Sequence, residues 1–268
     1  MSVELVHQML EPCRSAALEA GDAIMQVRAE ADKKVQQKAD FSPVTAADLA
    51  ADQIISQRLR ADFPDIVLTT EEQAATHVGQ PPEAFFIVDP LDGTKDFIRG
   101  DKDFTVNIAY VEQGCPVFGI VYAPAHDRLF YTSDDGSAVE EIGPFDKKTI
   151  GQTVKLNVSD DCSGALTIVA SKSHRDEATE DYISKYDVSG FRSAGSSLKF
   201  CLVASGEADL YPRLGRTMEW DTAAGDAILR AAGGKVLCFD AHTPLEYGKP
   251  GYANGHFIAA SSAVGIKR

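Results

Sequence analysis

Residues 85–94 of this chain read Phe85-Phe86-Ile87-Val88-Asp89-Pro90-Leu91-Asp92-Gly93-Thr94. A run of large apolar residues that stops at a Pro/Gly turn is typical of a strand covered on both faces. In open α/β sheets, ligands bind outside the carboxyl ends of such strands. Asp89 and Asp92 offer the hard oxygen ligands that Mg²⁺ takes, and Gly93 lets the backbone approach a phosphate closely. The stretch therefore indicates a metal and phosphate site or, in the simpler alternative, a solvated Asp-Gly turn.

The composition is that of a globular protein with an acidic surface. The 268 residues are 44% hydrophobic and 25% charged, which lies far from the disordered range. The formal net charge of -14 argues against a nucleic-acid polymer as partner, because such binders present basic faces to the phosphate backbone. An anionic substrate would need local positive charge, which metal ions held by clustered carboxylates supply. Solubility alone accounts for most of the acidic excess.

The cysteines and the N-terminal segment predict a cytoplasmic protein. The five cysteines are scattered and form no Cys-x-x-Cys pair, as expected of reduced thiols packed as small apolar groups. Glu4, Glu11 and Arg14 interrupt the apolar run that a signal peptide requires. No segment approaches the length needed to span a bilayer, so integral membrane contact is not expected. Peripheral association with the inner membrane stays open, as does the choice between monomer and homodimer.

The hydrophobic pattern predicts an α+β first half. Apolar residues at alternating steps of three and four predict a helix from Val6 to Val27. A second helix is expected from the N-cap Thr45 to about Arg60, with Asp48 reaching back to the cap. Strands of an antiparallel meander are expected at 85–88, 104–111, 116–122 and 129–131.

The second half alternates strands and helices, which favours an α/β layer. The polar, turn-rich segment 133–148 supplies the domain boundary. We therefore expect residues 1–145 to form an α+β metal-binding domain and residues 146–268 an α/β substrate-specificity domain packed tightly on it. The expected strands are 166–170, 208–211, 235–239 and 257–260, and the expected helices lie near 197–204 and 222–232.

Carboxylates recur where the expected elements begin or end. Asp48 lies in the first turn of a helix, Glu71 and Glu72 follow the apolar pair Val67-Leu68, and Asp221 precedes the helix near residue 222. Side chains at strand ends and helix starts can converge on one point. Each also has a simpler role, because Asp48 can complete a capping box and Asp221 can favour a helix N-terminus through the dipole.

Three separated motifs resemble those of the inositol monophosphatase superfamily, the lithium-sensitive, Mg²⁺-dependent phosphomonoesterases. They are Glu71-Glu72, Asp89-Pro90-Leu91-Asp92-Gly93-Thr94 and Trp220-Asp221-Thr222-Ala223-Ala224-Gly225, and their order and spacing match from about residue 38 to residue 234. One local departure is Thr69-Thr70, where Ser or Gly is expected immediately before the acidic pair.

Within that superfamily, four further segments are most similar to the CysQ-type 3'(2'),5'-bisphosphate nucleotidases. They are Ser42-Pro43-Val44-Thr45-Ala46-Ala47-Asp48, Asp92-Gly93-Thr94-Lys95-Asp96-Phe97, Gly195-Ser196-Ser197-Leu198-Lys199-Phe200 and Leu210-Tyr211-Pro212-Arg213. The inositol phosphatases typically have Asn where Asp96 stands.

The resemblance implies a layered αβαβα sugar-phosphatase fold, α/β in class, and a site for two or three Mg²⁺ ions. One ion would be held by Glu71, Asp89 and the Leu91 carbonyl, and a second by Asp89, Asp92 and Asp221. Such a pair of cations stabilises the attacking and leaving oxygens of an in-line phosphoryl displacement.

The resemblance also implies catalytic and phosphate-binding roles. Water on the first metal would be the nucleophile, with Thr94 and Asp48 placed to accept or relay its proton. Gly93 and Thr94 would direct backbone N–H groups at the phosphate. No phosphoenzyme forms in this mechanism.

The family pattern further implies His174, Ser196, Lys199 and Arg213 as contacts to the rest of a nucleotide, with the lysine and the arginine on the remaining phosphate. Each has a simpler interpretation. His174 can be a solvated loop residue, Ser196 a helix N-cap, and Lys199 a snorkelling surface side chain.

The implied reaction removes the 3'-phosphate of adenosine 3',5'-bisphosphate, giving AMP, and extends to 3'-phosphoadenylyl sulfate in sulfate assimilation. The same fold also allows inositol-1-monophosphatase or fructose-1,6-bisphosphatase activity. Two other classes remain open: a phosphatase with a covalent aspartyl-phosphate, whose Asp-x-Asp spacing is one residue shorter than that of Asp89 and Asp92, and a non-catalytic sensor of metal or phosphate.

Overall fold

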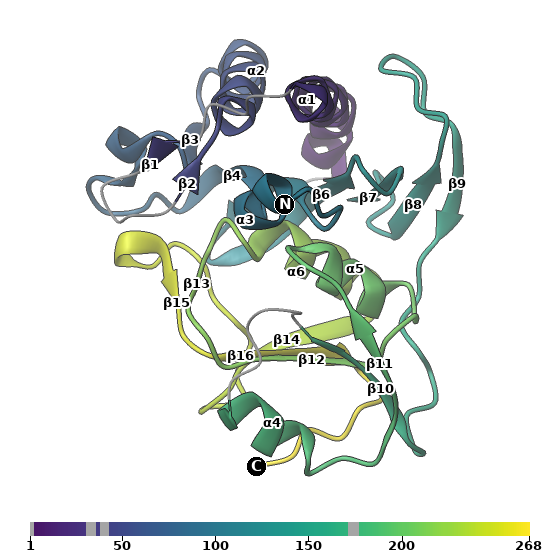
Figure 1. Cartoon of the computed structure of the whole chain (residues 1–268). Coiled ribbons are helices and arrows are strands. Elements are labelled where there is room, and N and C mark those ends of the chain that lie inside the picture. Colours follow the sequence, from purple (N-terminus) through teal and green to yellow (C-terminus); the bar gives the residue numbers. More distant parts are fainter. Residues whose placement is uncertain (1–2, 31–35, 38–42, 171–176) are drawn as a thin grey trace.

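The computed structural model describes residues 3–30, 36–37, 43–170 and 177–268. The described elements stack as a layered αβαβα arrangement (Figure 1), which confirms the predicted fold class. None of the described helices combines the length and the hydrophobicity required of a membrane span.

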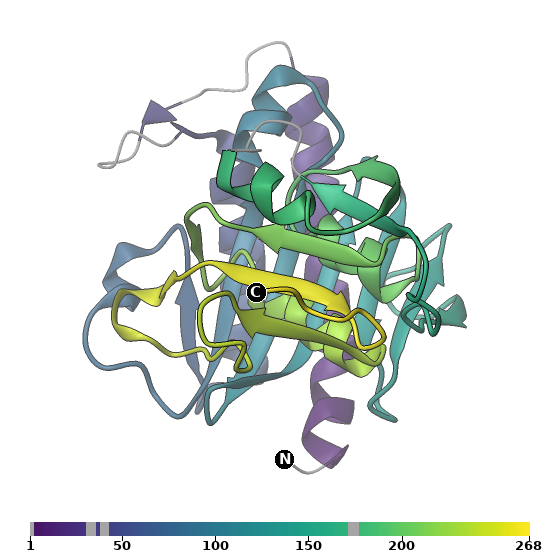
Figure 2. The same cartoon turned by 90° about the horizontal axis from the view of Figure 1, so that it is seen from below.

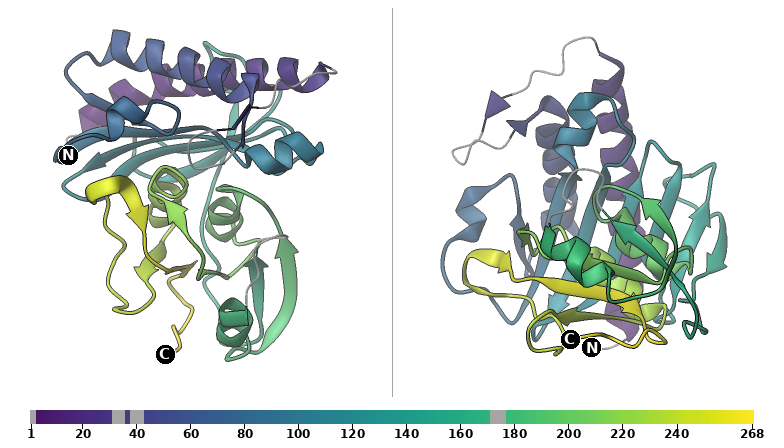
Figure 3. Two further views of the ribbon diagram at one scale, coloured as in Figure 1. Left: turned by 60° about the vertical axis from the view of Figure 1, so that its left-hand side comes forward. Right: turned by 60° about the horizontal axis from the view of Figure 1, so that its bottom comes forward.

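Two long helices form the outer layer, α1 (Val3–Ala29) and α2 (Ala46–Asp62), and they lie side by side on one face of the first sheet (Figure 3, left). Helix α2 begins as predicted. The Thr45 hydroxyl accepts from the Ala47 N–H and Asp48 accepts from the Thr45 N–H, so the side chains of a capping box satisfy the first backbone donors.

The first sheet has seven strands in the order β3-β4-β5-β6-β7-β8-β9, and only its β3–β4 pair is parallel among these neighbours. The strands are β3 (Val67–Thr70), β4 (Ala84–Asp92), β5 (Thr105–Glu112), β6 (Cys115–Ala123), β7 (Arg128–Thr132), β8 (Ala138–Ile142) and β9 (Gln152–Lys155). Two short helices flank β4, the 3-10 helix η1 (Ala74–His77) and α3 (Thr94–Arg99).

Strand β4 is covered on both faces, as its apolar run predicts. Phe86 and Val88 pack in the cluster under α1 and α2, whereas Phe85 and Ile87 pack in the cluster on the opposite face. The pairing of β4 with β5 shifts register between Asp89 and Asp92. A bulge of this kind redirects side chains at the end of a strand, and here it lies at the acidic motif.

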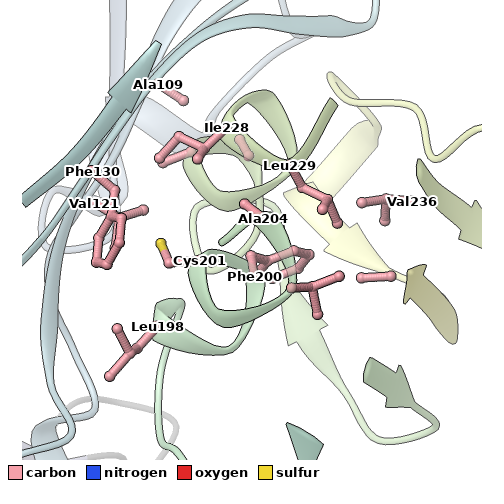
Figure 4. Packing of buried hydrophobic residues seen from close by; sticks show 14 of the residues in the cluster. Ala109, Val121, Phe130, Leu198, Phe200, Cys201, Ala204, Ile228, Leu229 and Val236 are labelled. Carbon is pink, nitrogen blue, oxygen red and sulfur yellow. The ribbon is translucent and has the colours of Figure 1, made fainter. Parts of the chain in front are cut away.

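Helices α5 (Leu198–Ala204) and α6 (Ala223–Ala231) form the layer between the two sheets. Figure 4 shows Cys201 of α5 directed toward Val121 and Phe130 of the first sheet, and Leu229 of α6 directed toward Val236 of the second. Because both helices bury residues on both sides, one continuous core joins the two sheets.

The second sheet has the order β11-β10-β12-β16-β14, and its strands cross those of the first sheet at a large angle (Figure 2). The strands are β10 (Leu166–Ala170), β11 (Val188–Ser193), β12 (Leu210–Arg213), β14 (Gly234–Cys238) and β16 (Phe257–Ser261). Helix α4 (Glu177–Ile183) covers the outer face by burying Tyr182 and Ile183 against Ile168 and Ile258.

Small elements complete the described chain: the two-stranded pairs β1 (Gln36–Gln37) with β2 (Pro43–Val44) and β13 (Thr217–Met218) with β15 (Ala253–Asn254), and the 3-10 helix η2 (Pro250–Tyr252). All five cysteines are free thiols, as expected. Strand β9 pairs with β8, so the first sheet reaches Lys155, beyond the expected boundary at residue 145. The division into two domains stays a prediction.

Candidate active site

Three carboxylates from different parts of the chain meet at one end of the first sheet. Glu71, Asp89 and Asp221 each place an oxygen within 4.8 Å of those of the other two. Glu71 follows β3 and lies beside β4, where its N–H donates to the Val88 carbonyl at 3.1 Å. Asp221 comes from the second half of the chain, just before α6. The parallel β3–β4 pair and the start of α6 therefore bring the predicted ligands together.

The three carboxylates line a pocket with a volume of about 380 Å³, and Asp92 lines it too. Its Oδ2 accepts from the Ser197 hydroxyl at 3.2 Å and from Asn107 Nδ2 at 3.4 Å. Ser197 also donates to the Asp221 carbonyl at 2.6 Å and accepts from Asn107 at 2.9 Å. Ser197 thus ties two of the predicted metal ligands to each other.

Ser197 and Asn107 support this site and were not predicted from the sequence. Asn107 had a visible signal, because it is a polar residue in the otherwise apolar run of strand β5. Ser197 lies next to the predicted contact Ser196, but only the fold shows that it is Ser197 that reaches Asp92.

Burial and the repulsion of neighbouring carboxylates act on Asp89, Asp92 and Asp221. Asp89 is 1% exposed, and burial together with the charges of Glu71, Asp92 and Asp221 raises its pKa well above the usual range. Burial and the charges of Asp92 and Glu71 likewise raise the pKa of Asp221. Burial also raises the pKa of Asp92, although Lys199 opposes the shift. The solvated-turn alternative for Asp89 is therefore wrong.

A divalent cation fits this arrangement. The donors are carboxylate oxygens, which are the ligands that Mg²⁺ prefers, and they are too close together to be charged at low cost without a cation between them. The Leu91 carbonyl lies in the same bulge and accepts from the Thr94 hydroxyl at 3.2 Å.

Asp48 and Thr94 are in direct contact. The Thr94 hydroxyl donates to Asp48 Oδ1 at 2.9 Å, while Asp48 Oδ2 accepts from the backbone and side chain of Thr45 at 2.7 and 2.6 Å. Capping and contact with Thr94 therefore coexist, because each uses a different oxygen. Burial raises the pKa of Asp48, against the opposing effect of the Thr45 hydrogen bonds.

Gly93 joins the bulge to α3 in a left-handed conformation, with φ of 94°. A Cβ at this position would lie 2.8 Å from the Asp103 carbonyl oxygen. Both the backbone angle and the close approach require glycine here. Gly93 and Thr94 line the pocket, as do Lys95 and Asp96.

Ser196, Lys199 and Arg213 line the other part of the pocket. Ser196 has a left-handed φ of 45°, and Ser197 rather than Ser196 is the N-cap of α5, so the capping alternative for Ser196 is wrong. Ser196 Oγ and Arg213 Nε are buried and have no hydrogen-bond partner within the described chain. Polar atoms in that state favour a polar ligand.

Lys199 is 5% exposed, so the snorkelling alternative is also wrong. Its Nζ donates to the Ser196 carbonyl at 2.7 Å and lies 5.3 Å from the centre of the Tyr211 ring. Burial and the charge of Arg213 lower its pKa to about 8, although Asp92 opposes the shift. His174 lies outside the described residues. The roles assigned to individual side chains stay predictions.

Comparison with known proteins agrees with this geometry. The model of the inositol monophosphatase family matches residues 5–265. A Salmonella typhimurium protein named 3'(2'),5'-bisphosphate nucleotidase CysQ is 45% identical over 241 residues, which are 89% of this chain and 94% of that protein. An Escherichia coli protein of the same name is 43% identical over the same shares of both chains.

Solved structures show the same fold. The crystal structure of CysQ from Bacteroides thetaiotaomicron, a bacterial member of the inositol monophosphatase family, superposes with a TM-score of 0.81 at 36% identity and covers 96% of this chain and 98% of its own. An inositol monophosphatase from Anabaena gives a TM-score of 0.74 at 26% identity, with 97% and 93% covered. The family is metal-dependent. The match along nearly the whole chain, at this identity and with this fold, shows that the chain belongs to the inositol monophosphatase family.

Proposed function

We propose that this protein is a Mg²⁺-dependent phosphomonoesterase that hydrolyses the 3'-phosphate of adenosine 3',5'-bisphosphate to AMP and phosphate, and that it also acts on 3'-phosphoadenylyl sulfate. The observation that carries the proposal is that one pocket is lined both by the carboxylate cluster and by two cationic side chains. These are Lys199, which is buried, and Arg213, which is half-buried. A substrate with two phosphates needs positive charge at both ends. The relatives named as bisphosphate nucleotidases support the same choice.

The chain's own residues would divide the work as follows. Glu71, Asp89, Asp92, Asp221 and the Leu91 carbonyl would hold two or three Mg²⁺ ions, which when bound lower the pKa of water and stabilise the charge of the transferred phosphoryl group.

Asp48 would take the proton of the attacking water through the Thr94 hydroxyl, because the two are hydrogen bonded at 2.9 Å and burial raises the pKa of the carboxyl. The P–O bond to the ribose oxygen would break as the water oxygen bonds to phosphorus, and the ribose oxygen would leave as the 3'-hydroxyl after taking up a proton from solvent. Arg213, as a planar fork of donors, and Lys199 would bind the remaining phosphate.

The test is a side-by-side comparison of phosphate release from adenosine 3',5'-bisphosphate, inositol 1-phosphate and fructose 1,6-bisphosphate, with Mg²⁺ and with a chelator. We expect Mg²⁺-dependent turnover that favours the nucleotide and is inhibited by lithium. Asp89→Asn and Asp221→Asn should nearly abolish it. Turnover of none of the three by metal-loaded protein would support the sensor, and a phosphoaspartyl species trapped in acid would overturn direct attack by water.

Specificity is tested at Arg213. Arg213→Ala should lower kcat/KM for the nucleotide by about 10- to 100-fold, as expected for the loss of a charged hydrogen bond, and should leave inositol 1-phosphate nearly unaffected. An unchanged ratio between the two substrates would remove the main support for the nucleotide.

The proposal includes a cytoplasmic location, which the five free thiols support. Association as monomer or homodimer is a matter for light scattering.

A further inference from the structure

The one departure from the family motif, Thr70 in front of Glu71, makes a contact that reaches another layer of the fold. Thr70 is the last residue of β3 and is fully buried. Its hydroxyl donates to Asp52 Oδ1 of helix α2 at 2.5 Å. Asp52 is itself 7% exposed, so this hydrogen bond is formed away from solvent.

The same carboxylate holds the other side of the acidic pair. Gln73 Nε2 donates to Asp52 Oδ2 at 2.7 Å and to the Ser56 hydroxyl at 2.9 Å. We call Asp52, Ser56, Thr70 and Gln73 the α2 anchor. Two of its members, Thr70 at the end of β3 and Gln73 beyond it, flank Glu71 and Glu72. Both ends of the segment that carries Glu71 are therefore attached to one helix.

The segment is also joined to the second half of the chain. His77 Nε2 donates to the Thr70 carbonyl at 2.8 Å, and the His77 ring stacks on that of Trp220 with 4.8 Å between centres. Trp220 directly precedes Asp221. Helix α2 thus holds Thr70 through its hydroxyl, and His77 holds it through its carbonyl. His77 in turn stacks on Trp220, the residue before another predicted metal ligand.

Such fixing matters because Glu71 is held among like charges. Its oxygen lies within 4.8 Å of those of Asp89 and Asp221. Without a cation, repulsion favours displacement of the segment that carries Glu71 from the cluster. A segment that had become disordered would have to be ordered again when a cation binds, and this would weaken binding. Preorganised ligands avoid that loss of affinity.

We propose that Thr70 and Asp52 are positioning residues that hold Glu71 in place for cation binding. The proposal rests on the proposed function only in that Glu71 is a metal ligand. Thr70 Oγ1 and Asp52 act through the backbone of the β3–η1 segment and touch neither cation nor substrate.

The test measures binding of Mg²⁺ alone to chelator-treated full-length protein by calorimetry, together with the melting temperature with and without Mg²⁺. Thr70→Val removes the hydroxyl at constant shape and should weaken Mg²⁺ binding by about 10-fold, the lower end of what loss of an outer partner does to metal affinity. Thr70→Ser keeps the hydroxyl and should bind Mg²⁺ like the wild type.

Asp52→Asn is the second variant. It keeps an oxygen that accepts from the Thr70 hydroxyl, but it places an amide donor opposite the Gln73 donor. Because the contact with Thr70 is kept, this variant should weaken Mg²⁺ binding less than Thr70→Val. Ser261→Ala is the matched control. Ser261 is fully buried in the second sheet and donates to the Ser159 carbonyl at 2.6 Å, so its loss should lower the melting temperature with and without Mg²⁺ equally.

The outcomes separate the two proposals. If wild type binds no Mg²⁺, the metal site of the proposed function fails. If wild type and Thr70→Val bind Mg²⁺ equally, or Thr70→Val behaves like Ser261→Ala, only the positioning role is overturned.

Discussion

Asp89 lowers the stability of the metal-free protein at the position where a metal ligand is predicted. Its side chain lies in the core among Glu71, Asp92 and Asp221, and its pKa is raised well above 3.8 for that reason. A folded protein with such a group keeps a proton that the unfolded chain has lost. The stability of the metal-free protein therefore falls as the pH rises from about the pKa of Asp89 in the unfolded chain through its raised pKa in the folded protein.

Asp89→Asn should consequently raise the melting temperature of the metal-free protein at pH 7, by about 2 to 4 °C for a change of roughly 1 kcal/mol. Asparagine keeps the acceptor for the Leu91 N–H, which is 3.0 Å from Asp89 Oδ1. The gain should shrink as the pH approaches 4 and turn into a deficit with Mg²⁺ present, because only the wild type gains from the cation. Calorimetry across pH checks this, and a lower melting temperature of metal-free Asp89→Asn at pH 7 would contradict it.

Lys199 makes substrate use depend on pH. Its pKa is lowered to about 8, so the ammonium loses its proton as the pH passes that value and its attraction for phosphate weakens. We expect KM for the bisphosphate nucleotide to rise between pH 7 and pH 9. Lys199→Arg keeps its charge over that range, so its KM should stay level. An equal rise in both proteins would assign the titration to another group.

At this scale the sequence predicted residue types better than their pairings. The acidic residues were identified because carboxylates at element ends are visible in the chain. The contacts of Ser197 with Asp92 and of Thr70 with Asp52 span 105 and 18 positions, and only the packing of the layers decides them.

Among the elements, α6 depends most on close backbone packing. A Cβ on Gly119 of β6 would lie 2.4 Å from the Ala224 carbonyl oxygen and 2.9 Å from its Cα. These are backbone atoms and cannot rotate away, so a side chain at residue 119 must displace the helix. The N-cap of that helix, Thr222, follows Asp221 directly.

Gly119→Ala should therefore destabilise the protein by about 1–3 kcal/mol, as overpacking does, and weaken Mg²⁺ binding as well. Gly190→Ala is the matched control, because a Cβ on Gly190 of β11 meets nothing within 4 Å. Denaturant unfolding and Mg²⁺ titration of both variants provide the measurement. Unchanged Mg²⁺ affinity in Gly119→Ala would mean that Asp221 is independent of the position of α6.

The elements that were predicted are those with a strong apolar pattern. Strand β4 and helices α1, α2, α5 and α6 bury enough residues to impose a periodicity on the sequence. Helix α3 is too short, at 6 residues, to show one, and all four residues of β9 are exposed. Such elements are set by their neighbours, α3 by the turn at Gly93 and β9 by pairing with β8.

On the scale of the whole molecule, the site lies where the two halves of the chain meet. Glu71 follows β3 and Asp89 lies in β4 of the first sheet, whereas Asp221 lies just before α6, in the layer of α5 and α6. That layer shares one hydrophobic cluster with both sheets. Neither half contains the complete set of predicted ligands.

We therefore expect a single thermal transition in which the calorimetric and van't Hoff enthalpies agree. Mg²⁺ should move the whole of this transition to a higher melting temperature. Two transitions, of which Mg²⁺ moves only one, would mean that the sheets unfold independently. Differential scanning calorimetry with and without Mg²⁺ distinguishes the two cases.

The stack of Trp220 on His77 has an optical consequence. Trp220 is the only tryptophan of the chain and is 7% exposed, and its ring contacts those of His77 and Tyr252, which also contact each other. Its fluorescence therefore comes from one place, the contact between the segment that carries Glu71 and the segment that carries Asp221. Any event that separates these segments exposes the indole to water and shifts its emission to longer wavelength. The protein thus contains its own spectroscopic reporter of whether the cluster is assembled.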